Sequence, residues 1–218
     1  MKPTVLIKRY RDFTRVNHWL VAILFLCAAL TGLAIFHPAM FPLAYLFGGG
    51  TWTRVLHPFF GVVMVLLFVL LFAQVVGENL WRPRDTQWLR AAPRFIRTGD
   101  ESVVPEVGKY NAGQKAVFWV SALCLLVLAI TGFAFWQPWF ADAFPIPVRR
   151  VAVVLHAFAA VVLILAIVVH VYAAIWIEGS LHAMTRGWVT TGWARRHHAL
   201  WQREVAPVDD GAPARPRA

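Results

Sequence analysis

Residues 151–177 read VAVVLHAFAAVVLILAIVVHVYAAIWI, an apolar run without a single charged side chain. A helix needs roughly 20 residues to cross the hydrocarbon core of a membrane, so this run predicts a membrane-spanning helix. Two histidines stand inside it, His156 and His170. At about 1.5 Å rise and about 100° rotation per residue, they lie about 40° apart around such a helix and about 21 Å apart along it. One face of the helix therefore carries an imidazole near each membrane surface.

The composition of the whole chain agrees with a membrane protein. Its 218 residues are 59% hydrophobic and only 15% charged, with a mean hydropathy of +0.59, which excludes an ordinary soluble domain. The runs long enough to span a membrane are residues 18–36, 55–76, 116–135 and 151–177. We therefore expect an all-α fold, an integral membrane four-helix bundle over residues 1–177, followed by a polar, basic cytoplasmic tail over residues 178–218.

Lysines and arginines are concentrated on one side of these spans. Of the 21, only Arg54, Arg149 and Arg150 lie in the first and third loops, and the rest lie in the N-terminal arm, the middle loop and the tail. The positive-inside rule then predicts a multi-pass protein of a bacterial inner membrane with both the N and C termini in the cytoplasm. The net charge of +10 reflects this topology and contact with anionic lipids, so we expect no nucleic-acid partner. A signal peptide is the rival interpretation of the first span, but that span ends in FHP, residues 36–38, without a small-residue cleavage pattern.

Depth and topology sort four histidines into two pairs. His57 and His156 fall near the outer surface, whereas His18 and His170 fall near the inner one. Low-spin haem b takes two axial ligands from facing helices of a bundle, and neutral imidazoles avoid most of the cost of burying a charge in lipid. We therefore expect two haem b groups stacked across the bilayer, with one iron bound by His57 and His156 and the other by His18 and His170. A single histidine at a membrane boundary, such as His18 or His57, is more often an interfacial polar residue, so the haem interpretation depends on the pairing.

The two cysteines and the histidines of the tail add no ligands to this site. Cys27 and Cys124 form no Cys-x-x-Cys-His motif and no iron–sulfur ligand set, which excludes covalent haem attachment. We expect His182, His197 and His198, in the tail, to be solvated.

Two arginines share a helix face with a haem ligand. Arg15 lies three residues before His18, and Arg54 lies three residues before His57. Each is therefore a candidate to bind a haem propionate. Charge that sets the topology is the alternative role of both arginines.

The end of the first span recurs at the end of the third, one hundred residues later. TGLAIFHP at residues 31–38 matches TGFAFWQP at residues 131–138, and after each a loop leads to a Leu-His pair, at His57 and at His156. The chain thus reads as two helical hairpins, each with a histidine near the outer surface. The glycines predict close packing of helices or room for a flat porphyrin.

The four-histidine pattern, together with GKYNAGQK at residues 108–115, resembles the cytochrome b (gamma) subunit of respiratory formate dehydrogenases. The resemblance covers roughly residues 10–188, and the histidine pattern alone is shared by a wider superfamily of dihaem cytochrome b561-like subunits. It implies a larger enzyme in which a molybdenum- or tungsten-containing catalytic (alpha) subunit oxidises formate. An iron–sulfur (beta) subunit then passes electrons to the outer haem, and the inner haem reduces a quinone, menaquinone or ubiquinone, near the cytoplasmic face. This chain would be the electron-transfer subunit and would hold no formate-oxidising residue itself.

The same resemblance implies a quinone site at Asn111, Gly113, Gln114 and the inner-haem ligand His170. The two amide side chains can hydrogen-bond a quinone carbonyl, and Gly113 lets the headgroup approach. A polar N-terminal cap of the third span is the alternative role of the stretch, and Asn111 can fill both roles at once.

Other functions fit the same histidine pattern. The chain could be the cytochrome b subunit of a nickel–iron hydrogenase or of another respiratory oxidoreductase, or a self-contained cytochrome b561 that oxidises a small reductant itself. A structural anchor or a transporter would show no haem absorbance.

Overall fold

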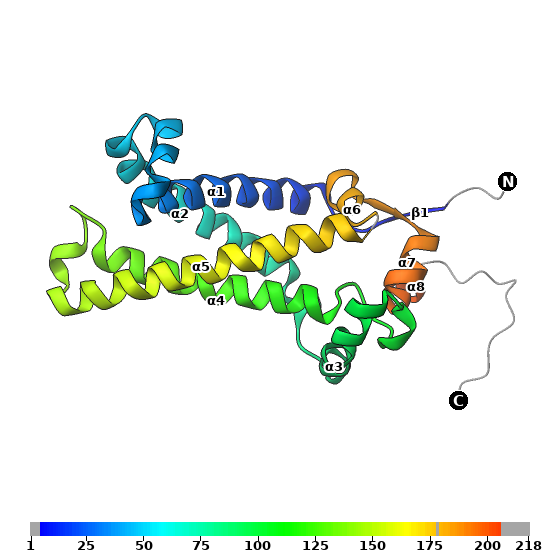
Figure 1. The fold of residues 1–218 in the computed structure, drawn as a ribbon. Helices are drawn as coiled ribbons and strands as arrows, with labels where there is room; N and C mark the ends of the chain where they lie inside the picture. Colours follow the sequence, from blue (N-terminus) through cyan, green and yellow to red (C-terminus); the bar gives the residue numbers. More distant parts are fainter. Residues whose placement is uncertain (1–4, 178, 206–218) are drawn as a thin grey trace, which may run out of the picture.

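The computed structural model describes residues 5–177 and 179–205, and four long apolar helices dominate this part of the chain (Figure 1). These helices are α1 (Asp12–Phe36), α2 (Gly50–Val75), α4 (Ala112–Phe135) and α5 (Ile146–Trp176). Each is long and apolar enough to cross a membrane, and only a small part of each apolar stretch is buried within the protein, as expected of side chains that face lipid. The four predicted spans are therefore confirmed.

Each long helix begins four to six residues before the apolar run that predicted it, but ends within one residue of the predicted end. The reason is that hydropathy detects the lipid-facing part of a helix and misses a polar first turn. Asp12 occupies the first turn of α1, and Asn111 caps the start of α4. Pro147 lies in the first turn of α5, where its missing N–H costs nothing.

The long helices form two hairpins. α1 packs along α2 and α4 along α5, whereas contacts between the hairpins are fewer and join α1 to α5 and α2 to α4. A buried apolar cluster takes residues from all four helices: Ala28, Met64, Cys124, Leu125 and Leu163. Leu163 lies midway in sequence between His156 and His170, so this cluster forms a dry layer across the centre of the bundle.

Shorter elements gather at the two ends of the bundle (Figure 1). At the end where the hairpins turn are the 3-10 helices η1 (Pro38–Phe47) and η4 (Ala141–Ala143). The opposite end carries the following: β1 (Leu6–Lys8), η2 (Val76–Asn79), α3 (Pro83–Thr98), η3 (Glu101–Val103), α6 (Ser180–Arg186), β2 (Trp188–Thr190), α7 (Thr191–His197) and α8 (Ala199–Val205).

One short sheet departs from the all-α class that the sequence predicted. β1 pairs antiparallel with β2, with Ile7 opposite Val189. Three-residue strands are too short for a recognisable alternation of apolar and polar residues, so the sequence carried no signal for them.

The segment predicted to be a solvated tail instead folds against the N-terminal arm, and we name residues 5–11 and 179–205 the terminal cap. Ala183, Val189, Ala194 and Trp201 form its buried apolar cluster. The prediction that His198 is solvated is wrong, because the side chain is only 3% exposed.

His198 and Arg9 join the terminal cap to the loop before α4. The Nδ1 of His198 lies 2.8 Å from the carbonyl oxygen of Gly108, which can only accept, so Nδ1 carries the proton. The Nε2 atom then accepts from Nη2 of Arg9 at 3.1 Å, and the same Nη2 donates to the carbonyl of Lys109. The Arg9 guanidinium also lies 4.9 Å from the ring centre of Trp201. The contact with Arg9 requires a neutral His198, because a protonated ring has no lone pair at Nε2 to accept the hydrogen bond.

The docking of the terminal cap is predicted to weaken in acid. Burial and the neighbouring Arg9 guanidinium lower the pKa of His198 to about 3, whereas a free histidine has a pKa of about 6.5. The undocked cap therefore binds a proton that the docked cap does not, and docking loses stability as the pH falls from about 6.5 towards 3. Hydrogen exchange of residues 179–205, corrected for its intrinsic pH dependence, should show faster exchange at pH 5 than at pH 7.5.

Two variants control this measurement. His198→Gln, which has no titrating ring, should remove the pH dependence, and His182→Gln, at an exposed position, should leave it unchanged. Equal pH dependence in the wild type and in His198→Gln would contradict the assignment.

Candidate functional site

The four histidines singled out in the sequence meet as two pairs. The ring centroids of His57 on α2 and His156 on α5 are 6.3 Å apart. Those of His18 on α1 and His170 on α5 are also 6.3 Å apart. α5 thus contributes one imidazole to each pair, and the two other ligand candidates come from different helices of the first hairpin.

The spacing within each pair fits a metal ion between the rings. An ion bound by one imidazole nitrogen on each side, at about 2 Å, separates the ring centroids by about 6 Å. Both pairs show this separation, and neither pair is joined by a direct hydrogen bond within the described part of the chain. The residues present therefore fit haem b with two axial imidazoles at each end of the bundle.

Threonines select the tautomer of the outer pair, His57 and His156. The Thr31 hydroxyl donates its single proton to the carbonyl of Cys27 at 2.7 Å, so its oxygen accepts from Nδ1 of His57 at 3.0 Å. Thr131 repeats the arrangement, donating to Val127 and accepting from Nδ1 of His156 at 3.0 Å. With the proton held at Nδ1, the lone pair of Nε2 is available to a metal, as in other histidine ligands oriented by a hydrogen bond.

These contacts explain the internal repeat. A Cβ atom at Gly32 would lie 3.1 Å from Cε1 of His57, and one at Gly132 would lie 3.4 Å from Cε1 of His156. In each hairpin the threonine orients the imidazole and the following glycine leaves room for it. The glycines thus accommodate the histidine ring itself, a contact that the sequence analysis did not anticipate although the repeat marked the positions.

The inner pair, His18 and His170, has no such support. Nδ1 of His18 is buried without a hydrogen-bond partner in the described part of the chain. The ring of Trp19 meets the His18 ring edge-on, with centroids 5.6 Å apart. The two ends of the bundle therefore hold imidazole pairs of the same spacing in different polar surroundings.

The two arginines proposed as propionate ligands lie at opposite ends of the bundle. Arg15 donates to the carbonyls of Met184 at 3.1 Å and of Thr185, and it forms an ion pair with Asp12 at 2.9 Å. Arg54 is exposed and lines a pocket of about 390 Å³ together with His37. Arg15 is therefore engaged with the terminal cap, and propionate binding by either arginine stays a prediction.

Three of the four residues of the expected quinone site, Asn111, Gly113 and Gln114, lie at the start of α4. The Asn111 side chain accepts from the backbone N–H of Gln114 at 2.9 Å, and the Gln114 side chain accepts from the N–H of Asn111 at 2.9 Å. This reciprocal cap uses the oxygen atom of each amide. Within the described residues, the two NH₂ groups donate to no other residue, so both can serve a ligand. His170 lies on α5 and makes no hydrogen bond to Asn111 or Gln114 there.

One neighbour of this cap had no signal in the sequence analysis. A Cβ atom at Gly113 would lie 3.5 Å from the indole of Trp88 on α3. Trp88 belongs to an amphipathic helix that hydropathy alone does not place, and only the folded structure brings it to Gly113.

A bundle of apolar helices that turns paired imidazoles toward one another is the architecture of a membrane cytochrome b. Residues 9–187 match the family model described as prokaryotic cytochrome b561. The chain belongs to this family, whose members bind haem b.

Curated relatives cover almost the whole chain. The formate dehydrogenase cytochrome b556(fdo) subunit of Escherichia coli (strain K12) is 42% identical over 205 residues, which are 94% of this chain and 96% of the relative. The cytochrome b556(Fdn) subunit of the nitrate-inducible formate dehydrogenase of the same strain is 38% identical over 209 residues, 96% of each chain. The formate dehydrogenase cytochrome b556 subunit of Haemophilus influenzae is 37% identical over 196 residues, 90% of this chain and 82% of the relative.

Removing the threonine support is predicted to weaken the outer site selectively. Thr31→Val deletes the acceptor for Nδ1 of His57, and losing such a partner typically costs about 10–100-fold in metal affinity. We expect the haem at the His57–His156 pair to be lost or shifted in a redox titration followed by absorbance, while the other haem signal stays unchanged. Thr31→Ser, which retains the hydroxyl, should behave as the wild type, and an unaltered titration of Thr31→Val would refute this role.

The two glycines provide a second comparison. Gly32→Ala should disturb the outer site more than Gly132→Ala, because the added methyl approaches its histidine more closely, 3.1 Å against 3.4 Å. The same redox titration reports both variants. A larger effect of Gly132→Ala would show that the glycines act in some other way.

Proposed function

We propose that this chain is the membrane-anchoring cytochrome b subunit of a formate dehydrogenase and conducts electrons across the membrane to a quinone. The observation that carries the proposal is the double pairing of His57 with His156 and of His18 with His170 at the two ends of one bundle. The relatives named as formate dehydrogenase cytochrome b556 subunits are 37–42% identical, and they support formate dehydrogenase as the enzyme to which this chain belongs. Two haem b groups, one at each histidine pair, supply the one-electron carriers for this transfer.

The protein contributes ligand geometry and a dry interior. Thr31 and Thr131 hold the outer imidazoles in the tautomer that leaves Nε2 free. The apolar layer around Leu163 separates the two pairs and keeps water and ions from the centre of the bundle. α5 spans this layer as one continuous helix, so it sets the distance between the pairs.

The distribution of basic residues orients the chain in the membrane. It favours an inner-membrane protein with both termini, the terminal cap and α3 on the cytoplasmic side. The end that carries η1 and η4 then faces the periplasm, where an iron–sulfur (beta) subunit would dock and deliver electrons from a molybdenum- or tungsten-containing (alpha) subunit. Arg15 and Arg54, near the inner and outer pairs, are the candidates to bind haem propionates.

The electron acceptor would bind at the cytoplasmic end. Asn111 and Gln114 present free amide NH₂ groups that can donate to a quinone carbonyl, and Gly113 admits the headgroup. His170 of the inner pair completes the proposed site. A quinone reduced there, menaquinone or ubiquinone, would take its protons from the cytoplasm, so electron flow inward would help to build a proton gradient.

Purification of the chain from its native membranes tests this proposal. We expect its haem b absorbance to be reduced by formate and reoxidised by added quinone, with iron–sulfur and molybdenum or tungsten subunits present. Reduction by hydrogen instead would indicate a hydrogenase subunit. Activity of the isolated chain with a small reductant would indicate a self-contained cytochrome b561, and the absence of haem b would contradict every version of the proposal.

A further inference from the structure

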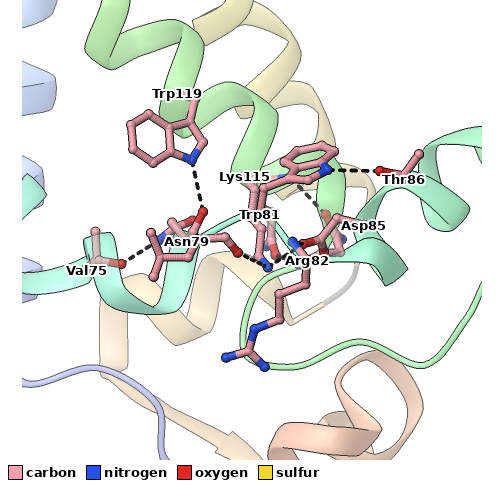
Figure 2. Close-up of polar contacts among 11 residues, drawn as sticks. Val75, Asn79, Trp81, Arg82, Asp85, Thr86, Lys115 and Trp119 are labelled. Carbon is pink, nitrogen blue, oxygen red and sulfur yellow. Dashed lines mark hydrogen bonds and ion pairs between the residues drawn. The ribbon is translucent and has the colours of Figure 1, made fainter.

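A buried ion pair fastens α3 to α4. Nζ of Lys115 lies 2.8 Å from Oδ2 of Asp85, and the two side chains are only 5% and 2% exposed. Lys115 also donates to the carbonyl of Leu80 at 3.0 Å, and Asp85 accepts from the backbone N–H of Arg82 at 2.7 Å (Figure 2). Each charge is thus paired and further hydrogen-bonded, which a buried ion pair requires.

A second bond at the same place ties η2, which follows α2, to α4. The indole N–H of Trp119 donates to the carbonyl of Asn79 at 3.0 Å, and the Asn79 side chain donates to Val75 at 2.8 Å (Figure 2). The chain that leaves α2 and the start of α3 are therefore both fastened to the first turns of α4.

The ion pair lies directly beside the cap that carries the free amides. Asp85 is the third residue of α3 and Lys115 the fourth residue of α4, one turn beyond Asn111. Burying two charges is costly, and apolar residues of similar volume usually dock helices at least as well. A charged pair additionally fixes the direction and register in which α3 packs on α4. Its position next to the Asn111–Gln114 cap indicates that the register of α3 matters at this cap.

Trp88 is the residue whose position this register determines. It follows Asp85 by three residues and so shares its side of α3. A Cβ atom at Gly113 would lie 3.5 Å from Cη2 of Trp88, 3.6 Å from its Cζ3 and 3.4 Å from Oδ1 of Asn111. The six-membered ring of the indole therefore borders the same small space at Gly113 as the side-chain oxygen of Asn111. An aromatic face beside two amide donors suits a flat ring with carbonyl groups on its edge.

We propose that Trp88 forms one wall of the quinone site and that the Asp85–Lys115 ion pair is the positioning device that holds this wall against Gly113. The proposal rests on the proposed function, in which a quinone headgroup binds at Asn111 and Gly113. Trp88 contacts the headgroup ring, whereas Asp85 and Lys115 act only through Trp88 and are positioning residues.

Steady-state kinetics of the whole complex tests the roles of these residues. Trp88→Ala should raise the KM for a soluble quinone analogue about three- to tenfold, with little change in kcat, in formate-driven dye reduction or in haem b absorbance. Trp88→Phe should retain most of the affinity. Leu89→Ala, at the neighbouring exposed position, is the matched control and should equal the wild type.

A double-mutant cycle separates positioning from simple folding. Asp85→Asn should raise the KM in the wild-type background but add nothing further to Trp88→Ala, because the wall is already absent. Additive effects on the KM, or an equal loss of dye reduction in Asp85→Asn, would overturn the positioning role.

Photolabelling of the unmodified complex needs no variant. An azido-benzoquinone and an azido-naphthoquinone, both with short isoprenoid tails, should label Trp88 or its α3 neighbours together with residues 111–115. Labelling of residues 111–115 without α3 would overturn the Trp88 wall while leaving the proposed quinone site in place. Labelling elsewhere in the complex would overturn both.

Discussion

The structure depends on one constraint, that each ring nitrogen of an imidazole in an apolar bundle needs a hydrogen-bond partner or a metal ion. An unpaired polar atom in hydrocarbon costs several kcal/mol (roughly 2–7 on transfer scales). In the outer pair Nδ1 donates to Thr31 or Thr131, and each Nε2 is left for a metal. The repeated Thr-Gly dipeptides and the placement of His57 and His156 both follow from meeting this constraint twice in one chain.

The inner pair does not meet this constraint with protein groups at His18, and this difference agrees with a second task at that end. Nδ1 of His18 lacks a protein partner among the described residues, and neither inner histidine has a threonine beside it. At this end the terminal cap holds the loop before α4 through Arg9 and His198, and the Asp85–Lys115 pair joins α3 to the first turn of α4. The outer end is thus built around a fixed pair of imidazoles, whereas the inner end combines an imidazole pair with an ordered start of α4 that presents amide groups.

The sequence predicted the elements whose signal is local. Apolar runs located the four spans, and helical periodicity together with the basic flanks paired the histidines at matching depths. The repeat at an offset of one hundred marked Thr31, Gly32 and their counterparts, but did not reveal that they contact the imidazoles.

What the sequence could not predict depends on contacts between distant segments. The terminal cap forms because Trp201, Val189 and Arg9 meet from opposite ends of the chain, and no local pattern shows that meeting. His198 was expected in solvent because its neighbours are polar, yet it is buried by residues nearly two hundred positions away. Trp88 reaches Gly113 only because an ion pair thirty residues apart in sequence fixes α3.

The central claim is that one helix supplies one ligand to each of two haem b groups. The most direct test is the pyridine haemochrome content of the purified chain with His57→Leu and His170→Leu made separately, and His37→Gln as a control outside both pairs. We expect two haem b groups in the wild type and in the control, and the loss of a different one in each replacement. Retention of both haem groups in His170→Leu would contradict the claim.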